Sequence, residues 1–508
     1  MNKKKREPKN ESTKVEESKQ SDQEIARQAK KEKLAQEGIN LFPHNAEKTH
    51  SIFEIVEGFS SLSKESLEEK KIKVKVPGRI MAIRRMGRAT FSHIADSQAN
   101  LQAYLREDKI GKKNYNLFSL IDIGDMVSVE GELFRTKTGE LTVLVDSFTF
   151  LAKCLHPLPE KWHGLKDVEL RYRKRFLDLI MNPQETEVFR LRSAMISKAR
   201  EFFDQKGFIE VETPMMHDIP GGALARPFKT YHNALGIDLY LRIAPELYLK
   251  KLIVGGFEKV YEINRNFRNE GISSEHNPEF TMLEWYQAYT DYHDMMELTE
   301  ELINFLSLSI LGKEEITYGE HKISLKRPWK RIKFKEALIE YSGLAPGNLD
   351  DRKGTIELAS TLAPDKKSLS YGKALDIIFD KNVKSHLIQP TFVIDPPKEV
   401  SPLAKASKEN PDEAERFELV MGSMEIANAF SELSDPEEQR KRFEQQAEER
   451  KKGDEDAHWI DADYIHALEY GLPPTGGEGI GIDRLVMLFA NRKSIREVIL
   501  FPLLRPRR

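Results

Sequence analysis

Apolar and charged residues begin to alternate at residue 71. Ile72, Val74 and Val76 alternate with lysines, a period of two that is typical of a strand with one buried face. More strand-like runs follow, separated by turn signals such as Met86-Gly87 and Thr138-Gly139. These runs are Arg79–Arg84, Ala89–Ile94, Leu101–Arg106, Asp125–Arg135 and Glu140–Leu151. Such closely spaced short strands predict a small closed barrel.

The predicted barrel, with a helical segment before its first strand, occupies residues 36–152, and the OB-fold is the leading candidate for it. Cationic and aromatic residues gather in its first half: Arg79, Arg84, Arg85, Arg88, Phe91 and Tyr104. Cations attract phosphates and aromatic rings stack on bases, so this composition suits a site for single-stranded RNA. A barrel that binds no ligand is an equally open interpretation.

Helical periodicity replaces the alternation after a polar linker at residues 153–184. One apolar stripe predicts a helix over Glu185–Gln205: Val188, Leu191, Met195, Ala199 and Phe202. Beyond a short strand that ends at Pro214, strand pairs and helices mix without a regular β-α-β rhythm. The fold class is therefore α+β, with an antiparallel sheet flanked by helices over residues 185–508 and a mostly helical insertion near residues 331–390.

Composition adds a feature at the N-terminus. Residues 1–35 carry eleven Lys and Arg against seven Asp and Glu, which predicts a disordered basic tail, with a helix from Gln23 to Gln36 as the alternative for its end. Such a tail is either a solubilising extension or an arm that attracts RNA. The chain has no apolar run long enough to cross a bilayer, and Cys154 is its one cysteine. We expect a reducing, cytoplasmic location and no membrane partner.

Candidate chemistry appears at residues 257–289, which predict two strands joined by the polar loop Asn269–Glu279, with Arg268 at the end of the first strand. Period two places four side chains on one face of the second strand: Phe280, Met282, Glu284 and Tyr286. An arginine, a carboxylate and aromatic rings on one face indicate the lining of a cleft. An exposed Arg–Glu ion pair is the alternative.

A second hairpin is predicted at Glu415–Leu433, with Gly422-Ser423 as its two-residue turn. Its register makes Glu418 and Glu425 diagonal neighbours, with Cβ atoms about 7–8 Å apart or less. Two carboxylates this close repel each other unless a cation lies between them, and carboxylate oxygens suit Mg²⁺. Two solvated glutamates are the alternative.

Strict alternation along the second strand of this hairpin conflicts with a single site. It places Asn428, Phe430 and Glu432 on the face opposite Glu425. If all four side chains serve one site, the strand must depart from regular pairing. We therefore predict a β-bulge or an equivalent irregularity between Glu425 and Asn428.

A glycine-rich segment at Gly471–Leu488 carries Arg484 at the start of an apolar helix. The segment is neither a P-loop nor a dinucleotide-binding fingerprint. Together with the two hairpins it resembles the motifs of class II aminoacyl-tRNA synthetases. The helix and strand that end at Pro214 resemble the first motif, Phe267–Phe280 the second, and Gly479–Arg484 the third.

Within the class, the chain is similar to the lysyl enzymes. Three runs carry this likeness: Ile219–Ala223, Ile243–Leu247 and Glu425–Leu433. The resemblance covers about residues 35–505, and combined motifs over that length are specific. Two departures are the double proline Pro396-Pro397 and the acidic Glu478 at a motif-three position that is often apolar.

The resemblance implies a set of ATP-binding residues: Arg268, Glu270, His276, Asn277, Phe280, Glu418 and Arg484. Arg268 and Arg484 are the implied catalytic residues, and Arg268 contacts both the α-phosphate and the lysine carboxylate. Phe280 and Arg484 are expected to sandwich the adenine ring, Glu270 to read its amino group and His276 to touch the γ-phosphate. Glu418 and Glu425 are the implied Mg²⁺ ligands.

The resemblance also implies a set of lysine-binding residues: Gly222, Glu246, Arg268, Glu284, Tyr286, Asn428, Phe430 and Glu432. Gly222 and Glu246 are expected at the α-ammonium group, and Glu284, Tyr286 and Glu432 at the ε-ammonium group. In the barrel, the positions that match anticodon-reading residues of the family are Phe91, Gln102 and Glu140.

The implied activity is the activation of L-lysine with ATP and its transfer to tRNA(Lys) by a homodimer, whose contact we expect on the stripe of Glu185–Gln205 and the strand to Pro214. The rival interpretations are an aspartyl- or asparaginyl-tRNA synthetase, a lysine ligase that modifies a translation factor, and a non-catalytic RNA-binding relative. Glu284 and Glu432 suit a cationic side chain better than aspartate. The predicted barrel speaks against the modifying ligase, and the intact candidate residues speak against a non-catalytic relative.

Overall fold

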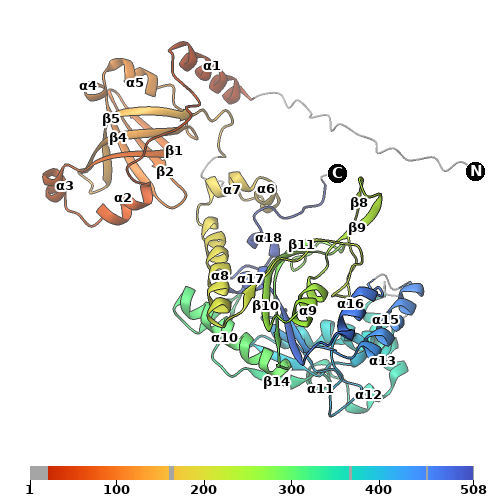
Figure 1. Cartoon of the computed structure of the whole chain (residues 1–508). Helices are drawn as coiled ribbons and strands as arrows, with labels where there is room; N and C mark the ends of the chain where they lie inside the picture. The colour runs from red at the N-terminus through yellow and green to blue at the C-terminus, as the bar shows by residue number, and fades with distance from the viewer. Residues whose placement is uncertain (1–20, 160–164, 365–368, 454–455, 507–508) are drawn as a thin grey trace, which may run out of the picture. The chain divides into compact units, whose positions relative to one another are not determined.

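The computed structural model describes residues 21–159, 165–364, 369–453 and 456–506 (Figure 1). The chain divides into two compact units, Met1–Pro183 and Gln184–Arg508. No helix in these described ranges is both long enough and apolar enough to cross a membrane.

The first unit is built on a closed barrel with the strand order β1-β2-β3-β5-β4. The strands are β1 (Lys73–Met86), β2 (Ala89–Ala95), β3 (Asn100–Arg106), β4 (Met126–Arg135) and β5 (Leu141–Ala152). This confirms the predicted barrel, although the first two predicted runs form one long strand that is bent at a register shift between Ile80 and Ala82. Apolar side chains at alternate positions fill the interior, among them Val74, Val76 and Ile94.

Helices surround this barrel and continue beyond it: α1 (Asp22–Gln36), α2 (Ile52–Phe59), α3 (Lys64–Lys70), α4 (Glu107–Ile110), α5 (Lys112–Phe118), α6 (Val168–Arg173) and α7 (Arg175–Met181). Helix α1 packs on the barrel, because Leu34 is buried in the barrel core and Arg27 donates hydrogen bonds to the carbonyls of Ile123 and Cys154 at 2.9 and 2.8 Å. The prediction of a disordered tail is therefore wrong for residues 22–35, and its helical alternative is confirmed. Residues 1–20 of the predicted tail lie outside the described residues.

The second unit is built on an eight-stranded sheet with the order β14-β15-β16-β17-β18-β11-β10-β6. Its strands are β6 (Ile209–Glu210), β10 (Lys259–Phe267), β11 (Glu279–Ala288), β14 (Lys330–Lys333), β15 (Thr391–Ile394), β16 (Arg416–Met421), β17 (Met424–Ser431) and β18 (Thr475–Gly481). Neighbouring strands run antiparallel except at the two edges, where β14 is parallel to β15 and β6 is parallel to β10. The predicted α+β class with an antiparallel sheet is confirmed.

One face of this sheet is covered by α8 (Glu185–Gln205), α10 (Tyr292–Leu311) and α17 (Ile482–Phe489) (Figure 1). Leu283 and Trp285 of β11 point into this core, as period two requires. Val188, Met195 and other members of the α8 stripe are buried here within the chain itself. The expectation that this stripe lies open for a partner subunit is therefore wrong.

The opposite face carries α9 (Glu246–Val254), α15 (Pro436–Lys451) and α16 (Ala462–Glu469), which share a smaller core with Tyr286. Smaller elements complete the unit: β7 (Met216–His217), β8 (Lys229–His232), β9 (Ile237–Leu241), β12 (Glu315–Tyr318), β13 (His321–Ser324), η3 (Lys398–Val400) and α18 (Ile495–Val498). The Asp483 carboxylate ties α17 to β11 and to α8, because it accepts from the Thr281 amide at 2.7 Å and from Arg192 of α8 at 2.6 Å.

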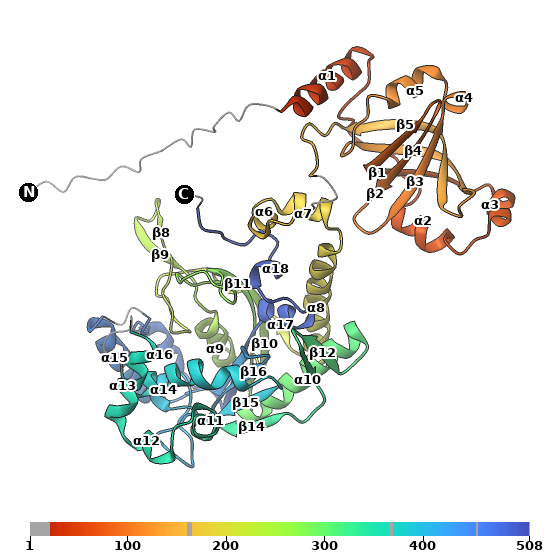
Figure 2. The ribbon, with the colours of Figure 1, turned by 180° about the vertical axis from the view of Figure 1, so that it is seen from behind.

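The predicted insertion near residues 331–390 is mostly helical where it is described. It contains α11 (Phe334–Ser342), α12 (Pro346–Asp350), α13 (Arg352–Leu362), α14 (Tyr371–Ile378), η1 (Phe379–Val383) and η2 (Lys384–His386). The insertion leaves the sheet at β14 and returns at the neighbouring strand β15, so residues 331–333 belong to the sheet itself. Figure 2 shows these helices beside β14 and β15.

Candidate active site

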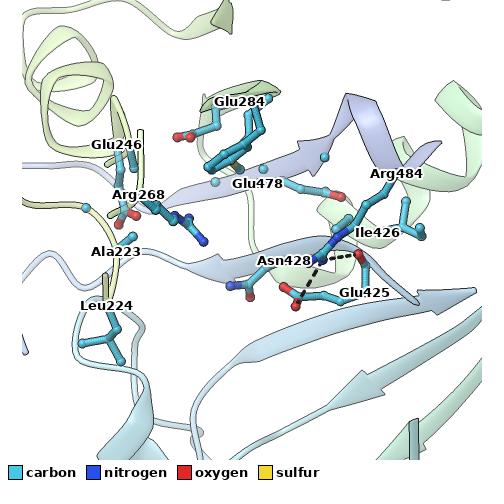
Figure 3. A pocket seen from close by; sticks show the side chains of 18 of the residues that line it. Ala223, Leu224, Glu246, Arg268, Glu284, Glu425, Ile426, Asn428, Glu478 and Arg484 are labelled. Atoms are coloured by element: carbon cyan, nitrogen blue, oxygen red, sulfur yellow. Dashed lines mark hydrogen bonds and ion pairs between the residues drawn. The ribbon is translucent and has the colours of Figure 1, made fainter. Parts of the chain in front are cut away.

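A cavity of about 360 Å³ lies on the sheet face that is opposite α8 and α10. Most of the residues predicted to bind ATP, lysine or the metal line it: Gly222, Glu246, Arg268, Glu270, His276, Asn277, Phe280, Glu284, Tyr286, Glu425, Asn428, Phe430 and Arg484. Glu418 and Glu432 do not line it. Figure 3 shows Arg268 after the end of β10, Glu284 on β11, Asn428 on β17 and Arg484 on α17 around the cavity.

The floor of the cavity depends on two glycines of β18. Gly479 lies between Glu284 of β11 and Asn428 of β17, and Gly477 lies between Tyr286 and Phe430 in the same way. A Cβ on Gly477 would come within 2.3 Å of the Tyr286 ring, and one on Gly479 would come within 2.8 Å of Met282. Since neither glycine has a side chain, side chains from the two flanking strands, β11 and β17, line one common cavity.

The predicted irregularity in β17 is confirmed. Glu425 pairs with Val420 and Ala427 pairs with Leu419, which leaves Ile426 as an extra residue in β17. An extra residue breaks the period of two, so Glu425 and Asn428 both line the cavity although three positions separate them.

Arg268 follows the last residue of β10, and its guanidinium lies over the Phe280 ring, 5.1 Å from the ring centroid. Its Nε atom is buried and has no hydrogen-bond partner among the described residues. A buried cationic donor without a partner is costly, so it indicates that an anionic ligand completes the site.

Arg484 connects the second and third motifs. It donates to the Glu425 carbonyl at 2.7 Å and to Nε2 of His276 at 3.1 Å. Burial and the positive charge of Arg484 lower the pKa of His276, which keeps the imidazole neutral and able to accept this bond. The two side chains, expected at the adenine ring and at the γ-phosphate, are therefore joined to each other and line the same cavity.

Glu284 is 3% exposed and has no ion-pair partner among the described residues. Its neighbour on β10, Glu262, pairs with Arg242 at 2.7 Å instead. Burial, followed by the charges of Glu246 and Glu262, raises the pKa of Glu284 well above its usual range. The alternative of an exposed Arg–Glu ion pair is therefore wrong, and the carboxyl group is available to a buried cation.

Glu418 and Glu425 form the candidate metal site. Burial and the charge of Glu425 raise the pKa of Glu418, which indicates that the two carboxylates are close. No cluster of three or more His, Cys, Asp and Glu suited to a metal occurs in the described ranges. Two carboxylates alone fit Mg²⁺, because this ion commonly takes one or two carboxylates and completes its shell with phosphate oxygens and water.

Two cations beside this site were missed in the sequence. Arg416 bonds Asn428 at 2.9 Å and forms an ion pair with Glu418 at 2.6 Å. Lys384, from the insertion, has a raised pKa despite its burial because of the charges of Glu425 and Glu418. Alternation along the predicted hairpin could have indicated Arg416, whereas only the packing of the insertion brings Lys384 here.

Glu246 and Glu432 lie on either side of a lysine of the chain itself. Lys250 forms an ion pair with Glu246 at 2.6 Å and another with Glu432, and all three side chains are buried. Gly222 packs against Glu246 with a φ of +88°, and a Cβ there would lie 3.0 Å from the Glu246 Cβ. The sequence spacing of Glu246 and Lys250, one helical turn, could have indicated their contact.

Glu478, the acidic departure in the third motif, lies on the other side of β18. Thr299 of α10 donates to its carboxyl group at 2.5 Å, and burial raises the pKa of Glu478 well above its usual range. Because the carboxyl group is neutral, it can occupy a buried position beneath the cavity floor, where an apolar residue often stands in the class.

Of the predicted anticodon residues, Phe91 lies on β2 and Gln102 on the neighbouring strand β3, and Glu140 immediately precedes β5, which pairs with β3. Phe91 stacks on Tyr104 with ring centroids 4.3 Å apart. The Gln102 amide donates to Glu140 at 2.7 Å, and His93, which the sequence did not indicate, contacts the other Glu140 oxygen at 3.0 Å.

The basic cluster of the barrel is smaller than the sequence indicated. Arg79 donates to the Gly124 carbonyl at 2.8 Å, and Arg85 donates to two other main-chain carbonyls. Arg84, Arg85 and Arg88 are all exposed, but neither Arg84 nor Arg88 donates to a main-chain carbonyl among the described residues, and Arg88 has only a long ion pair of 3.9 Å with Glu107. Arg84 and Arg88 are therefore the members of the cluster that are best placed for phosphates.

Comparisons with known proteins agree with this geometry. The family model for class II tRNA synthetases (D, K and N) matches residues 167–505, and the model for an OB-fold nucleic acid binding domain matches residues 74–151. The lysine–tRNA ligase of Carboxydothermus hydrogenoformans is 56% identical, covering 93% of this chain and 96% of its own length. The lysine–tRNA ligases of Pelotomaculum thermopropionicum and Halalkalibacterium halodurans are 54% and 52% identical, and each alignment covers 94% of this chain.

The glycine floor makes a prediction about stability. Gly477→Ala should destabilise the second unit by about 1–3 kcal/mol, because the new methyl group overlaps the Tyr286 ring. Urea unfolding followed by Trp fluorescence measures this change. Gly271→Ala, at a position of the cavity lining with open space around it, is the control. Equal stability of Gly477→Ala and the unmodified protein would show that the floor tolerates side chains.

Proposed function

Since the chain belongs to the lysine–tRNA ligase family within the class II tRNA synthetases, we propose that it activates L-lysine with ATP and joins it to tRNA(Lys). The observation that carries the amino-acid specificity is Glu284, a buried carboxyl group that lines the cavity without a cation of its own. A pocket for aspartate or asparagine needs positive or neutral groups at this place, so these rival substrates are disfavoured.

The residues of the cavity divide between the two substrates. We assign ATP to Arg268, Glu270, His276, Asn277, Phe280, Glu418 and Arg484. We assign lysine to Gly222, Glu246, Arg268, Glu284, Tyr286, Asn428, Phe430 and Glu432. The two sets meet at Arg268, which is where the carboxylate of lysine must approach the α-phosphate.

The first reaction needs no nucleophile from the protein. The carboxylate of lysine attacks the α-phosphorus, a bond to that carboxylate oxygen forms, and the bond to pyrophosphate breaks. Arg268 holds both reacting groups and offsets the negative charge that develops on the α-phosphate. Arg484, held by Glu425 and His276, fixes the adenine end of the nucleotide together with Phe280. A ribose hydroxyl of the tRNA 3′ end then attacks the adenylate, and AMP leaves.

We propose that Glu418 and Glu425 hold Mg²⁺ together with the phosphates of ATP. The ion would neutralise phosphate charge and favour the departure of pyrophosphate. We also propose a cytoplasmic setting, on the ground that the chain carries one cysteine, Cys154, and therefore has no internal disulfide to maintain.

The test of the proposed function is ATP–pyrophosphate exchange measured separately with each of the twenty amino acids. Lysine alone should support fast exchange. Exchange that depends on aspartate or asparagine would overturn the assignment of the pocket. No exchange with any amino acid, together with binding of tRNA, would favour a non-catalytic relative.

Glu284 gives a sharper test of the lysine pocket. Glu284→Gln should lower kcat/KM for lysine by roughly 10²–10³-fold, because the ε-ammonium group loses a buried charged partner worth about 3–5 kcal/mol. The KM for ATP should change little, since Arg268, Phe280 and Arg484 are untouched. Steady-state exchange kinetics and the melting temperature are measured together, and an unchanged KM and kcat for lysine would disprove the assignment.

The raised pKa of Glu284 adds a pH dependence. Only the carboxylate form binds an ammonium group well, so a proton must leave Glu284 when lysine binds. The KM for lysine should therefore fall as the pH rises from acidic to mildly alkaline values, above the range in which an ordinary glutamate titrates. Glu284→Gln, which cannot lose this proton, should show a flatter profile. A wild-type KM that is independent of pH would contradict the buried, neutral state of the free pocket.

The barrel is proposed to bind the anticodon through Phe91, Gln102 and Glu140. Phe91→Ala should remove a stacking contact worth roughly 1–3 kcal/mol. Aminoacylation should fall while lysine-dependent pyrophosphate exchange stays near its normal rate, and Phe53→Ala, elsewhere in this unit, is a control for indirect effects. An equal fall of both activities in Phe91→Ala would show that the barrel is not a separate tRNA module.

We propose a homodimer on new grounds, since the α8 stripe is buried within the chain. Ile209, Met215 and Met216 are about half exposed, at 51%, 48% and 54%, and Ile209 lies on the edge strand β6. Exposed apolar side chains beside a strand edge favour an interface. Sedimentation at micromolar concentration should give twice the 58.5 kDa chain mass. A species of single mass that Met216→Asp leaves unchanged would argue against this interface.

A further inference from the structure

Lys250 is a fully buried lysine whose place in the fold the proposed reaction does not explain. It lies in α9, one turn after Glu246, with 0% exposure. Its ammonium group forms ion pairs with Glu246 Oε1 at 2.6 Å and with Glu432 Oε2. The rings of Phe430 and Tyr464 lie 5.4 and 5.6 Å from it, so aromatic faces complete its surroundings.

The two carboxylates that Lys250 contacts border the amino-acid part of the cavity. Glu246 lines the cavity directly. Both oxygens of Glu432 are buried without a hydrogen bond of good geometry among the described residues, and only Oε2 forms the ion pair with Lys250. Oε1 lies 2.2 Å from the point that a Cβ of Gly477 would occupy, and Gly477 and Tyr286 both line the cavity. Lys250 thus takes one oxygen of Glu432 and leaves the other toward the cavity side.

The charges beside the amino-acid part of the cavity match a substrate with two ammonium groups. Glu246, Glu284 and Glu432 supply three negative charges, and Lys250 supplies one positive charge. The α- and ε-ammonium groups of lysine would bring the sum to zero, while the carboxylate of the substrate belongs to Arg268. A substrate with one ammonium group would leave a buried carboxylate uncompensated, which is unfavourable.

We propose that Lys250 is a positioning residue that selects a diammonium substrate: it anchors Glu246 and Glu432 by one oxygen each and thereby aims their free oxygens at different ammonium groups. This inference rests on the proposed lysine specificity. Burial raises the pKa of Glu432 to about 8 and also raises that of Glu246, and the charge of Lys250 acts against both shifts. Lys250 therefore also favours the ionised state in which these carboxylates bind ammonium groups.

The test uses the full-length protein and lysine-dependent pyrophosphate exchange. Lys250→Met keeps the length of the side chain and removes its charge. We expect the KM for lysine to rise by about 10²-fold, the size expected for a broken buried ion pair. The KM for ATP should stay within about twofold, and the preference for lysine over norleucine, which lacks the ε-ammonium group, should fall. Lys251→Met is the matched control, because Lys251 is the next residue of α9 and pairs with the exposed Asp463.

A double variant separates positioning from a merely structural ion pair. Lys250→Met with Glu432→Gln removes the buried cation and one of its two carboxylate partners, so the melting temperature should recover in part relative to Lys250→Met alone. The KM for lysine should stay high, because Glu432 is itself a proposed ligand of the substrate and Glu246 is no longer anchored. Recovery of the melting temperature and the KM together would overturn the proposal, and so would a normal lysine KM in Lys250→Met.

Lys250→Arg covers the case in which Lys250→Met does not fold. It keeps the charge but spreads the two carboxylates around a planar guanidinium group, so the KM for lysine should again rise while the KM for ATP does not. An unchanged lysine KM in this variant would overturn the proposal. Wild-type protein without lysine-dependent exchange would instead refute the proposed function, which keeps the two failures distinguishable.

Discussion

The cavity depends on the absence of side chains at two central positions of the sheet. Gly477 and Gly479 lie on β18 between β11 and β17, where a Cβ would overlap Tyr286 and Met282. A glycine inside a strand costs roughly 0.5–1 kcal/mol relative to alanine, so the surrounding core must offset two such positions. In return, side chains from strands that are not neighbours in the sheet meet across β18.

The ion pairs within the protein then decide which charged side chains of the cavity remain available to a substrate. Each buried charge needs a partner, and the fold supplies one for most of them. Arg242 neutralises Glu262, and Lys250 lies between Glu246 and Glu432. Glu284 receives no cation, and the rise in its pKa lets it remain neutral until a ligand arrives. Glu284, buried in the cavity lining without a cation, is thus the group that we propose distinguishes a cationic substrate.

The β-bulge at Ile426 shapes the same cavity from β17. A regular strand would turn either Glu425 or Asn428 away from the cavity, because successive side chains point to opposite faces. The extra residue lets Glu425 meet Arg484 on the nucleotide side while Asn428 meets Arg416. One irregular position therefore joins the proposed nucleotide site to the proposed amino-acid site on a single strand.

The sequence by itself determined the elements and the chemical groups of this protein. Period two predicted the barrel and the faces of β11, and the conflict between alternation and a single site predicted the bulge. Such patterns are local, because the period of a strand and the turn chemistry of a hairpin depend on residues that are close in the chain. Only the tertiary structure decided the partners of those groups. Lys384 reaches the candidate metal site from a distant insertion, and the α8 stripe is covered by the chain's own sheet. Which partner a buried charge finds depends on contacts between residues that are far apart in the sequence. A local periodic pattern carries no information about such contacts.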